Sequence, residues 1–353
     1  MPESLPAMSS PARECRALQS ARPVRRAVVV GLGSAGRRHA QNLLSLGVES
    51  VEAVSEWRKL GEAEVGGVEL RVAHSLEQAL ASGPEIAVIA NPTSLHARSA
   101  AAALNAGCHV YVEKPLAETA KAARPLVELA RRRRQVLAVG CQLRFNTCLE
   151  RLKALLENGR LGRILHAQAV MGEYLPDYHP DEDYRQSYAA RAALGGGILL
   201  TQIHELNYLQ WLFGSFESVY AVGGKTSNLE IDVEDNVSLL LRTPEGLAVS
   251  AHIDFLQRPR RRTVTVCGEQ GAASWDYDRN TLTLTVPGAE PSELGPGGPL
   301  DRNRMFLDAM SDFLNCAAAG ARPRTDAAQG LADVRLADAA RASMTHRRVE
   351  PIT

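Results

Sequence analysis

The chain has 353 residues, more than a single hydrophobic core usually serves, so we expect two domains. Its 40 basic and 40 acidic side chains cancel, which argues against nucleic acid or an anionic membrane as the main partner and favours a small-molecule ligand. The six cysteines are scattered and form no Cys-x-x-Cys pair. The chain also has no apolar run of the ~18 residues that span a bilayer and no signal-peptide core. These features predict a soluble, cytoplasmic protein.

The first third of the chain has the pattern of a doubly wound α/β domain. Residues 1–22 mix Pro, Ser, Glu and Arg without any period, so we expect a flexible tail there. Short apolar runs then alternate with helical segments, as in a parallel sheet buried on both faces. They predict a six-stranded unit over residues 23–141. Five of its strands are expected at Ala27–Val30, Val51–Ser55, Ile86–Ala90, Val110–Val112 and Val136–Gly140, and its helices at Arg37–Leu46, Leu76–Ala81, Leu95–Ala106 and Glu118–Arg134.

Residues 142–353 have a different pattern, which predicts a second, α+β domain. After a helix at Thr147–Asn158, longer alternating strands follow one another without helices between most of them, as in an open, mostly antiparallel sheet. These strands are expected at Ile164–Gly172, Ser218–Val222, Asn236–Arg242, Ala248–Phe255, Arg262–Cys267 and Ala272–Tyr277. The segment Pro287–Pro299 is expected to be a surface loop, and two helices, Met305–Ala318 and Ala327–Ala342, close the chain.

A glycine-rich loop directly follows the first predicted strand. It reads Gly31-Leu32-Gly33-Ser34-Ala35-Gly36 and leads into a helix. Gly31 permits a tight turn, Gly33 lets the backbone approach a pyrophosphate, and Gly36 lets helix and strand pack closely, while the helix N-terminus offers free N–H groups to the anion. The loop, including Ser34 and Ala35, therefore predicts dinucleotide binding by a Rossmann domain.

The residues after the second strand bear on which dinucleotide binds. Glu56 stands at the tip of this strand, where a carboxylate can hydrogen-bond the ribose 2′-hydroxyl and repel a 2′-phosphate, which favours NAD. Arg58 and Lys59 follow directly and could instead bind that phosphate, or belong to a solvated turn. We therefore expect NAD, with NADP left open.

Polar residues also follow the other predicted strands of this sheet. Glu113-Lys114-Pro115 ends an apolar strand, so Lys114 would be delivered next to the bound dinucleotide, which suggests a dehydrogenase. Asn91, Pro92 and His96 lie at a strand end and the following helix start. They are predicted to border the cofactor, although a purely structural turn is as good an interpretation.

Several motifs together resemble the Gfo/Idh/MocA oxidoreductases. They are the run from Ile89 through His96, the run from Cys108 through Pro115, Leu143-Arg144-Phe145, Tyr174-Leu175-Pro176, Asp183-Tyr184-Arg185 and Gly195 through Glu205. The resemblance implies NAD(P)-dependent oxidation or reduction of a sugar or polyol carbon, a Glu-Lys-Pro lysine beside the nicotinamide, and a Lys-Pro bond that is often cis. It also implies a homo-oligomer formed through the C-terminal sheet. The stretch from Tyr174 to Tyr208 is similar to a branch associated with surface-glycan sugars.

Hydride transfer from a secondary alcohol needs a base for the hydroxyl proton and a donor that stabilises the developing alkoxide. Lys114, cationic at neutral pH, is suited to polarising the oxygen, and His204 is suited to exchanging the proton. The structural alternatives are a buried core histidine and a surface lysine that ends a strand.

Thr201 departs from the family pattern, in which many members carry Asp at this position before the histidine. A threonine can hydrogen-bond substrate, but it cannot support an imidazolium as a carboxylate does. Either Lys114 and His204 act alone, or Glu205 or Asp183 compensates, or activity is weak or lost.

A polyhydroxylated substrate needs several fixed donors and acceptors. Besides Thr201 and His204, the candidate substrate-binding residues are Arg144, Tyr174, Asp183, Tyr184 and Arg185. No metal site is expected, because the acidic loop around His179 is more simply a solvated loop.

The leading hypothesis is an NAD(P)-dependent dehydrogenase or reductase acting on a CH–OH group of a sugar, sugar derivative or nucleotide sugar. The first alternative is a non-catalytic NAD(P)-binding sensor or scaffold with a decayed site, which the absence of a carboxylate at Thr201 motivates. The second is an NAD-dependent glycosidase or rearrangement enzyme that recycles its cofactor.

Overall fold

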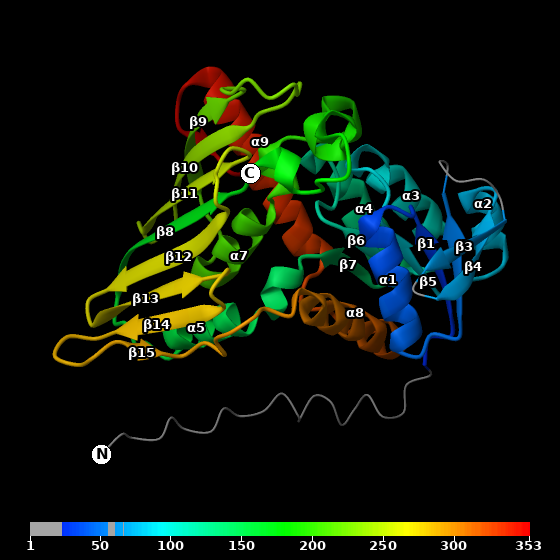
Figure 1. Cartoon of the computed structure of the whole chain (residues 1–353), viewed down its shortest axis with the longest axis horizontal. Coiled ribbons are helices and arrows are strands. Elements are labelled where there is room, and N and C mark those ends of the chain that lie inside the picture. The colour runs from blue at the N-terminus through cyan, green and yellow to red at the C-terminus, as the bar shows by residue number, and fades with distance from the viewer. Residues whose placement is uncertain (1–22, 56–60, 66) are drawn as a thin grey trace, which may run out of the picture.

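The computed structural model describes residues 23–55, 61–65 and 67–353. The predicted tail, residues 1–22, and the predicted cofactor residues Glu56 and Arg58 lie outside the described residues. The described chain forms two sheets, one of seven strands and one of nine, which lie next to each other with helices against them (Figure 1). The predicted fold class, a doubly wound domain followed by an α+β domain with an open sheet, is confirmed.

The first sheet has the strand order β3-β4-β2-β1-β5-β6-β7. Six strands are parallel, and only β3 at the edge is antiparallel to its neighbour. β1 lies between β2 and β5, so the strand order reverses there, and ligands of such sheets bind outside the strand ends at this reversal. The strands are β1 (Arg26–Val30), β2 (Ser50–Val54), β3 (Gly61–Val65), β4 (Val68–Ala73), β5 (Ile86–Ile89), β6 (His109–Glu113) and β7 (Leu137–Gly140).

The hairpin β3–β4 was not among the predicted strands, although β4 supplies the sixth parallel strand of the expected unit. The predicted helices are present as α1 (Ser34–Ser45), α2 (Leu76–Ala81), α3 (Thr93–Asn105) and α4 (Ala120–Arg133). Sequence signals explain the ends of α4: the side chain of Thr119 accepts a hydrogen bond from the backbone N–H of Ala122, and Arg134 ends the helix in the left-handed conformation.

The second sheet has the order β15-β14-β13-β12-β8-β11-β10-β9-β16, and only its β8–β11 pair is parallel. Its strands are β8 (Ile164–Gly172), β9 (Ser218–Gly224), β10 (Asn236–Arg242), β11 (Ala248–Asp254), β12 (Arg261–Gly268), β13 (Gly271–Asp276), β14 (Thr281–Thr285), β15 (Ser292–Glu293) and β16 (Glu350–Pro351). Three of these strands were not predicted: β14, β15 and β16. Because β15 lies within Pro287–Pro299, this predicted loop is partly a strand. Such short strands are set by pairing with a neighbour more than by their own pattern.

The helices of this half pack on one face of the nine-stranded sheet, where the largest core cluster is found. They are α5 (Thr147–Glu157), α6 (Ile198–Thr201), α7 (His204–Phe213) and α9 (Ala327–His346). On the other face the outward residues of β9 and β10 are exposed and include three large apolar side chains. These are Tyr220 at 39%, Val222 at 57% and Leu240 at 53% exposure.

The chain returns to the first sheet through α8 (Arg302–Ala319). Met310 and Phe313 of α8 are buried in the same cluster as residues of β1, β5 and α1, and Figure 1 shows α8 beneath this sheet. The ring of Phe313 meets that of Tyr111 edge to face, with centroids 5.6 Å apart. A division of the chain at residue 141 stays a prediction, and the contacts of α8 tie the two halves together.

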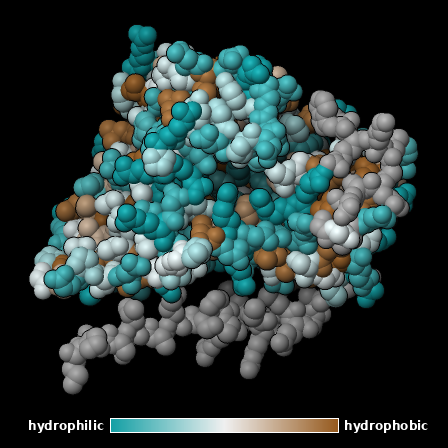
Figure 2. Space-filling view, in the orientation of Figure 1, coloured by the Kyte–Doolittle hydropathy of each residue, from teal (hydrophilic) through white to brown (hydrophobic). Residues whose placement is uncertain are grey.

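Within the described residues, no helix combines the length and apolar composition that crossing a membrane requires. The face of the molecule in Figure 2 is mainly hydrophilic, and its apolar residues are scattered over it.

Replacing Phe313 by alanine tests this connection. Because the side chain is 1% exposed, the substitution leaves a cavity, and we expect Phe313→Ala to lower the free energy of unfolding by about 3–5 kcal/mol. Urea denaturation measures this change. The control is Leu46→Ala at an exposed position, for which a change within about 0.5 kcal/mol is expected. Equal effects of the two substitutions would contradict the packing role of α8.

Candidate active site

A cleft of about 830 Å³ lies between the two halves, at the ends of β1, β5 and β6. A ligand site is expected at this position, because the strand order of the sheet reverses at β1. Most of the residues that the sequence predicted for cofactor, substrate or catalysis line it. They are Gly31, Gly33, Ser34, Ala35, Asn91, Pro92, His96, Glu113, Lys114, Thr201 and His204.

The glycine loop is shaped to receive a dinucleotide phosphate. Gly31 has φ +98°, and a Cβ there would lie 2.7 Å from the carbonyl oxygen of Ala90. A Cβ on Gly36 would lie 1.8 Å from the carbonyl oxygen of Gly31, so loop and helix touch. Gly33, by contrast, faces open space and precedes α1 without a side-chain cap. The free N–H groups of α1 therefore point into the cleft, and the loop fits a pyrophosphate.

The loops after β5 and β6 are joined by His96. Its ring nitrogens lie 2.7 Å from the carbonyl oxygen of Pro115 and 2.9 Å from that of Asn91. The side chain of Asn91 in turn donates to Ser99. The Lys114–Pro115 bond is cis, as the resemblance implied. His96 therefore lies at the predicted border of the cleft, and its visible contacts hold the two loops together.

Lys114 lies where both halves meet. Its Nζ donates to the backbone carbonyl of Thr201 over 2.7 Å and lies 3.4 Å from the hydroxyl of Tyr188. The preceding Glu113 lies 2.6 Å from Nε2 of the buried His39. Burial opposes ionisation of this carboxyl, but the hydrogen bond with His39 and nearby positive charges outweigh it and lower the pKa of Glu113. The lysine is thus fixed with its ammonium in the cleft.

His204 is the first residue of α7 and is 5% exposed. Burial first, and then the positive charges of Lys114 and two arginines, hold its pKa well below the ordinary value of 6.5. The imidazole is therefore neutral at physiological pH and can accept a proton. Gln142, which the sequence did not single out, places its amide nitrogen 3.4 Å from His204 Nε2.

Three buried polar atoms around this point have no hydrogen-bond partner. They are Nδ1 of His204, Oγ1 of Thr201 and Oε1 of Gln142. An unsatisfied buried polar atom costs about 1–3 kcal/mol, and such atoms gather where a ligand supplies the missing partner. All three residues line the cleft.

No carboxylate takes the place of the family's aspartate at Thr201. Glu205, fully buried, accepts from Nε of Arg262 over 2.8 Å. Burial raises the pKa of Glu205, although the guanidinium of Arg262 opposes this. Asp183 pairs with Arg185 outside the cleft. Neither carboxylate hydrogen-bonds to His204, so the structure gives the imidazole no acidic partner among the described residues.

The five other predicted substrate residues do not line the cleft. Arg144 is 6% exposed and stacks on Trp211. Tyr174 packs under the guanidinium of Arg258. Asp183 and Arg185 bind each other at the surface, and the hydroxyl of the neighbouring Tyr184 accepts from the backbone N–H of Glu230. The structure therefore does not bring these five residues into the cleft, and their role in substrate binding stays a prediction.

Other residues of the second half line the cleft instead. Arg262 donates to Gln202, and Gln202 donates to the hydroxyl of Tyr178, which makes a connected polar wall. The remaining members are Glu173, His179, Tyr188, Arg260, Tyr277, Arg302, Met305 and Phe306. The basic run Arg258–Arg262 was visible in the sequence, but only the pairing of β12 with β8 shows which of its side chains turn to the cleft.

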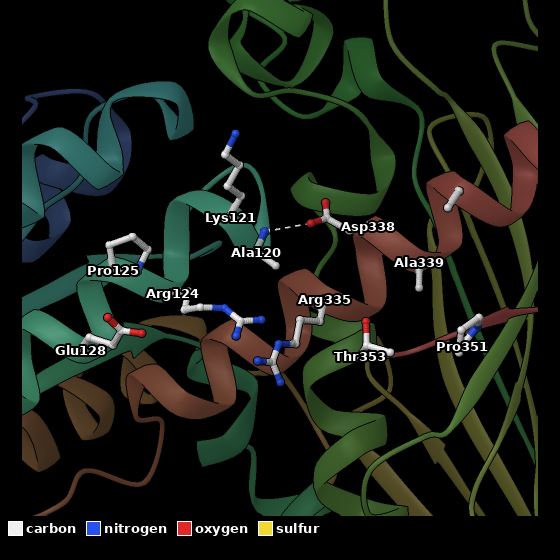
Figure 3. A pocket seen from close by; sticks show the side chains of 11 residues that line it. Ala120, Lys121, Arg124, Pro125, Glu128, Arg335, Asp338, Ala339, Pro351 and Thr353 are labelled. Atoms are coloured by element: carbon white, nitrogen blue, oxygen red, sulfur yellow. Dashed lines mark hydrogen bonds between the residues drawn. The ribbon is translucent and has the colours of Figure 1, made fainter.

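No group of three or more potential metal ligands occurs in the part of the chain that the structure describes. A second hollow lies between α4 and α9 (Figure 3), where the side chains of Arg124 and Arg335 approach each other. A hydrogen bond from the backbone N–H of Ala120 to Asp338 closes one side. None of the predicted site residues lines this hollow.

Two family models match the chain. Residues 25–141 match the model described as "Oxidoreductase family, NAD-binding Rossmann fold", and residues 149–274 match the "GFO/IDH/MocA C-terminal domain". The chain belongs to the Gfo/Idh/MocA family of oxidoreductases, which confirms the resemblance, and its N-terminal domain is an NAD-binding Rossmann domain.

Named relatives are dehydrogenases. Levoglucosan dehydrogenase of Pseudarthrobacter phenanthrenivorans is 28% identical over 56% of this chain and 57% of its own length. Inositol 2-dehydrogenase 2 of Saccharopolyspora erythraea is 28% identical over 92% of this chain and 94% of its own. The structure of the WlbA dehydrogenase from Bordetella pertussis with NADH and UDP-GlcNAcA has a TM-score of 0.77 and 26% identity, covering 94% of this chain and 99% of that one.

Two glycine substitutions separate folding from cofactor binding. Gly33→Ala adds a Cβ that meets no protein atom within 4 Å, so we expect unchanged stability but about tenfold weaker NADH binding, because the backbone can no longer approach the pyrophosphate. Gly36→Ala collides with the carbonyl of Gly31 and should lower the melting temperature as well. Fluorescence titration with NADH and thermal unfolding measure both. Unchanged NADH affinity in Gly33→Ala would rule out this binding mode.

Proposed function

We propose that this protein is an NAD-dependent dehydrogenase or reductase that interconverts a secondary alcohol and a ketone on a sugar or sugar derivative. The observation that carries the proposal is the meeting of Lys114 and His204, from different halves of the molecule, in the cleft that the glycine loop also lines. The names of the relatives, which include levoglucosan and inositol dehydrogenases, support a sugar or polyol as substrate.

The reaction requires two groups besides the dinucleotide. A dinucleotide held at the glycine loop would supply the acceptor for the hydride of the carbinol carbon. The hydroxyl proton passes to His204, whose burial keeps the imidazole unprotonated and ready to accept it. The ammonium of Lys114 stabilises the negative charge that develops on the substrate oxygen. In the reverse direction His204 returns the proton to that oxygen.

The carbonyl of Thr201 holds the lysine in place. Because Nζ of Lys114 donates to this carbonyl over 2.7 Å, the ammonium retains further N–H donors for the substrate oxygen. The same peptide segment leads into His204 three residues later. The Lys114 ammonium and the His204 imidazole therefore keep a fixed separation, which orients the substrate hydroxyl for the reaction.

A non-catalytic NAD-binding protein is the second candidate, and the lack of any acidic partner for His204 is the observation that favours it. A neutral imidazole is nevertheless the form that a base requires, and the lowered pKa keeps His204 in that form, while it also makes the imidazole a weaker base. Both candidates predict NADH binding, but only the dehydrogenase predicts turnover of a sugar.

Substitution of His204 distinguishes them. With levoglucosan, myo-inositol and UDP-GlcNAcA offered as substrates and NADH formation followed by absorbance, we expect turnover with at least one and a loss of about a hundredfold or more in kcat for His204→Gln. NADH affinity should change little, because the histidine acts on the substrate. His166→Gln at an exposed position of β8 is the matched control and should be silent. NADH binding without turnover on any of a broad sugar panel would favour the scaffold.

The pH profile of the wild type adds a second test. Since the pKa of His204 is lowered, the base is lost only at a pH below the ordinary histidine range. We therefore expect the acid limb of kcat/KM for alcohol oxidation below pH 6.5. An acid limb above this value would show that another group is the base.

We further propose that the exposed face of the nine-stranded sheet joins copies of this chain. Val222 and Leu240 are more than half exposed, and Tyr220 lies directly opposite Leu240 in the β9–β10 pair. Apolar side chains gathered on an open face mark an interaction surface.

The five described cysteines are free, which supports the proposed cytoplasmic location.

A double substitution, Val222→Lys with Leu240→Lys, tests this surface. Desolvating two cations at an interface is unfavourable, so we expect the wild type to sediment as an oligomer and the variant as a smaller species with retained secondary structure. Leu46→Lys, an exposed apolar position in the first domain, is the control and should keep the wild-type mass. A monomeric wild type at micromolar concentration would overturn the proposal.

A further inference from the structure

Two arginines of the cleft, Arg38 and Arg302, have no acidic partner among the described residues. Arg38 of α1 is half-buried, and Arg302, the first residue of α8, is exposed; both line the cleft. Neither side chain makes a hydrogen bond or an ion pair with any described residue. The guanidinium of Arg38 lies 4.5 Å from the centre of the Phe306 ring, one turn along α8 from Arg302. The two cations therefore approach the cleft from neighbouring helices.

The other charges at this end of the cleft are balanced within the protein. Arg262 is paired with Glu205, and Arg260 is paired with Asp278 and lies 3.8 Å from Glu173. Glu113 attracts Arg38, but this carboxylate is held by His39 at 2.6 Å and forms no ion pair with the arginine. Of the arginines at this end of the cleft, Arg38, Arg260, Arg262 and Arg302, only Arg38 and Arg302 therefore lack an ion pair with a described residue.

Leaving these cations together is unfavourable unless something else neutralises them. After burial, the charge of Arg302 is the largest cause that lowers the pKa of Arg38, so the two repel each other. Arg302 also stands in the first turn of α8, where the helix dipole disfavours a cation. A planar guanidinium presents paired N–H donors that match the two oxygens of a carboxylate or phosphate.

We propose that Arg38 and Arg302 form a binding subsite for an anionic group, a carboxylate or a phosphate, carried by the sugar substrate. This inference rests on the proposed function and adds the class of substrate: an acidic or phosphorylated sugar derivative. The dinucleotide pyrophosphate is a second source of the same chemistry. The substrate is favoured, because the N-terminus of α1, which has no side-chain cap, offers its own N–H groups to the pyrophosphate, and because Arg302 lines the cleft together with His204 and Glu173.

Binding to the full-length protein saturated with NADH tests the subsite without requiring turnover. Isothermal titration with D-glucuronate and D-glucose 6-phosphate, each compared with neutral D-glucose, measures the contribution of the anionic group. We expect at least one anionic probe to bind about tenfold more tightly than D-glucose, and Arg38→Gln and Arg302→Gln each to remove most of this difference. The control is Arg124→Gln, which removes an exposed arginine of the second hollow (Figure 3) and should change nothing.

The other outcomes are equally informative. Equal affinity for anionic and neutral probes, or anion binding that survives both substitutions, overturns the subsite. If Arg38→Gln and Arg302→Gln weaken NADH binding instead, the arginines serve the cofactor and the inference is wrong. A neutral sugar oxidised without preference for an anion would leave the proposed function standing and remove the subsite. Anion binding without turnover of any sugar would retain the subsite and contradict the dehydrogenase.

Discussion

The hydrogen bond from Lys114 Nζ to the carbonyl of Thr201 is the contact on which the site depends. Lys114 follows β6 of the first sheet, and Thr201 ends α6 of the second half, so this 2.7 Å bond joins groups that are 87 residues apart in sequence. It fixes the ammonium where the turn into α7 presents His204. This hydrogen bond therefore sets the position of the Lys114 ammonium relative to His204, although the two side chains come from different halves of the molecule.

The electrostatics of the cleft follow from this arrangement. Burial first, and then the positive charges led by Lys114, keep His204 neutral. The cleft therefore contains an unprotonated imidazole with no carboxylate hydrogen-bonded to it among the described residues. The carboxylates nearby are used elsewhere: Glu113 binds His39, and Glu205 binds Arg262.

The two halves of the molecule are also tied together by packing. α8 follows the second sheet in sequence, yet its Met310 and Phe313 are buried against the first. The same helix begins with Arg302 at the cleft and carries Phe306 beneath Arg38. Movement of one half relative to the other would therefore change the packing of α8 and the position of the unpaired arginines at the same time.

The sequence by itself determined the doubly wound domain and the glycine loop, because both depend on local pattern: apolar runs and glycines that permit close approach. It proposed Lys114 from a motif at a strand end and His204 through the family resemblance, and their catalytic roles stay predictions. It did not find β3 and β14, whose strands are stabilised by their neighbours. It also proposed Arg144 and Asp183 for substrate binding, and the structure places both outside the cleft, because a motif does not reveal which side chains the fold turns toward it. Only the tertiary structure decided that Gln142, Arg262 and the unpaired Arg38 and Arg302 share one cleft, because the fold brings them together from four elements distant in sequence.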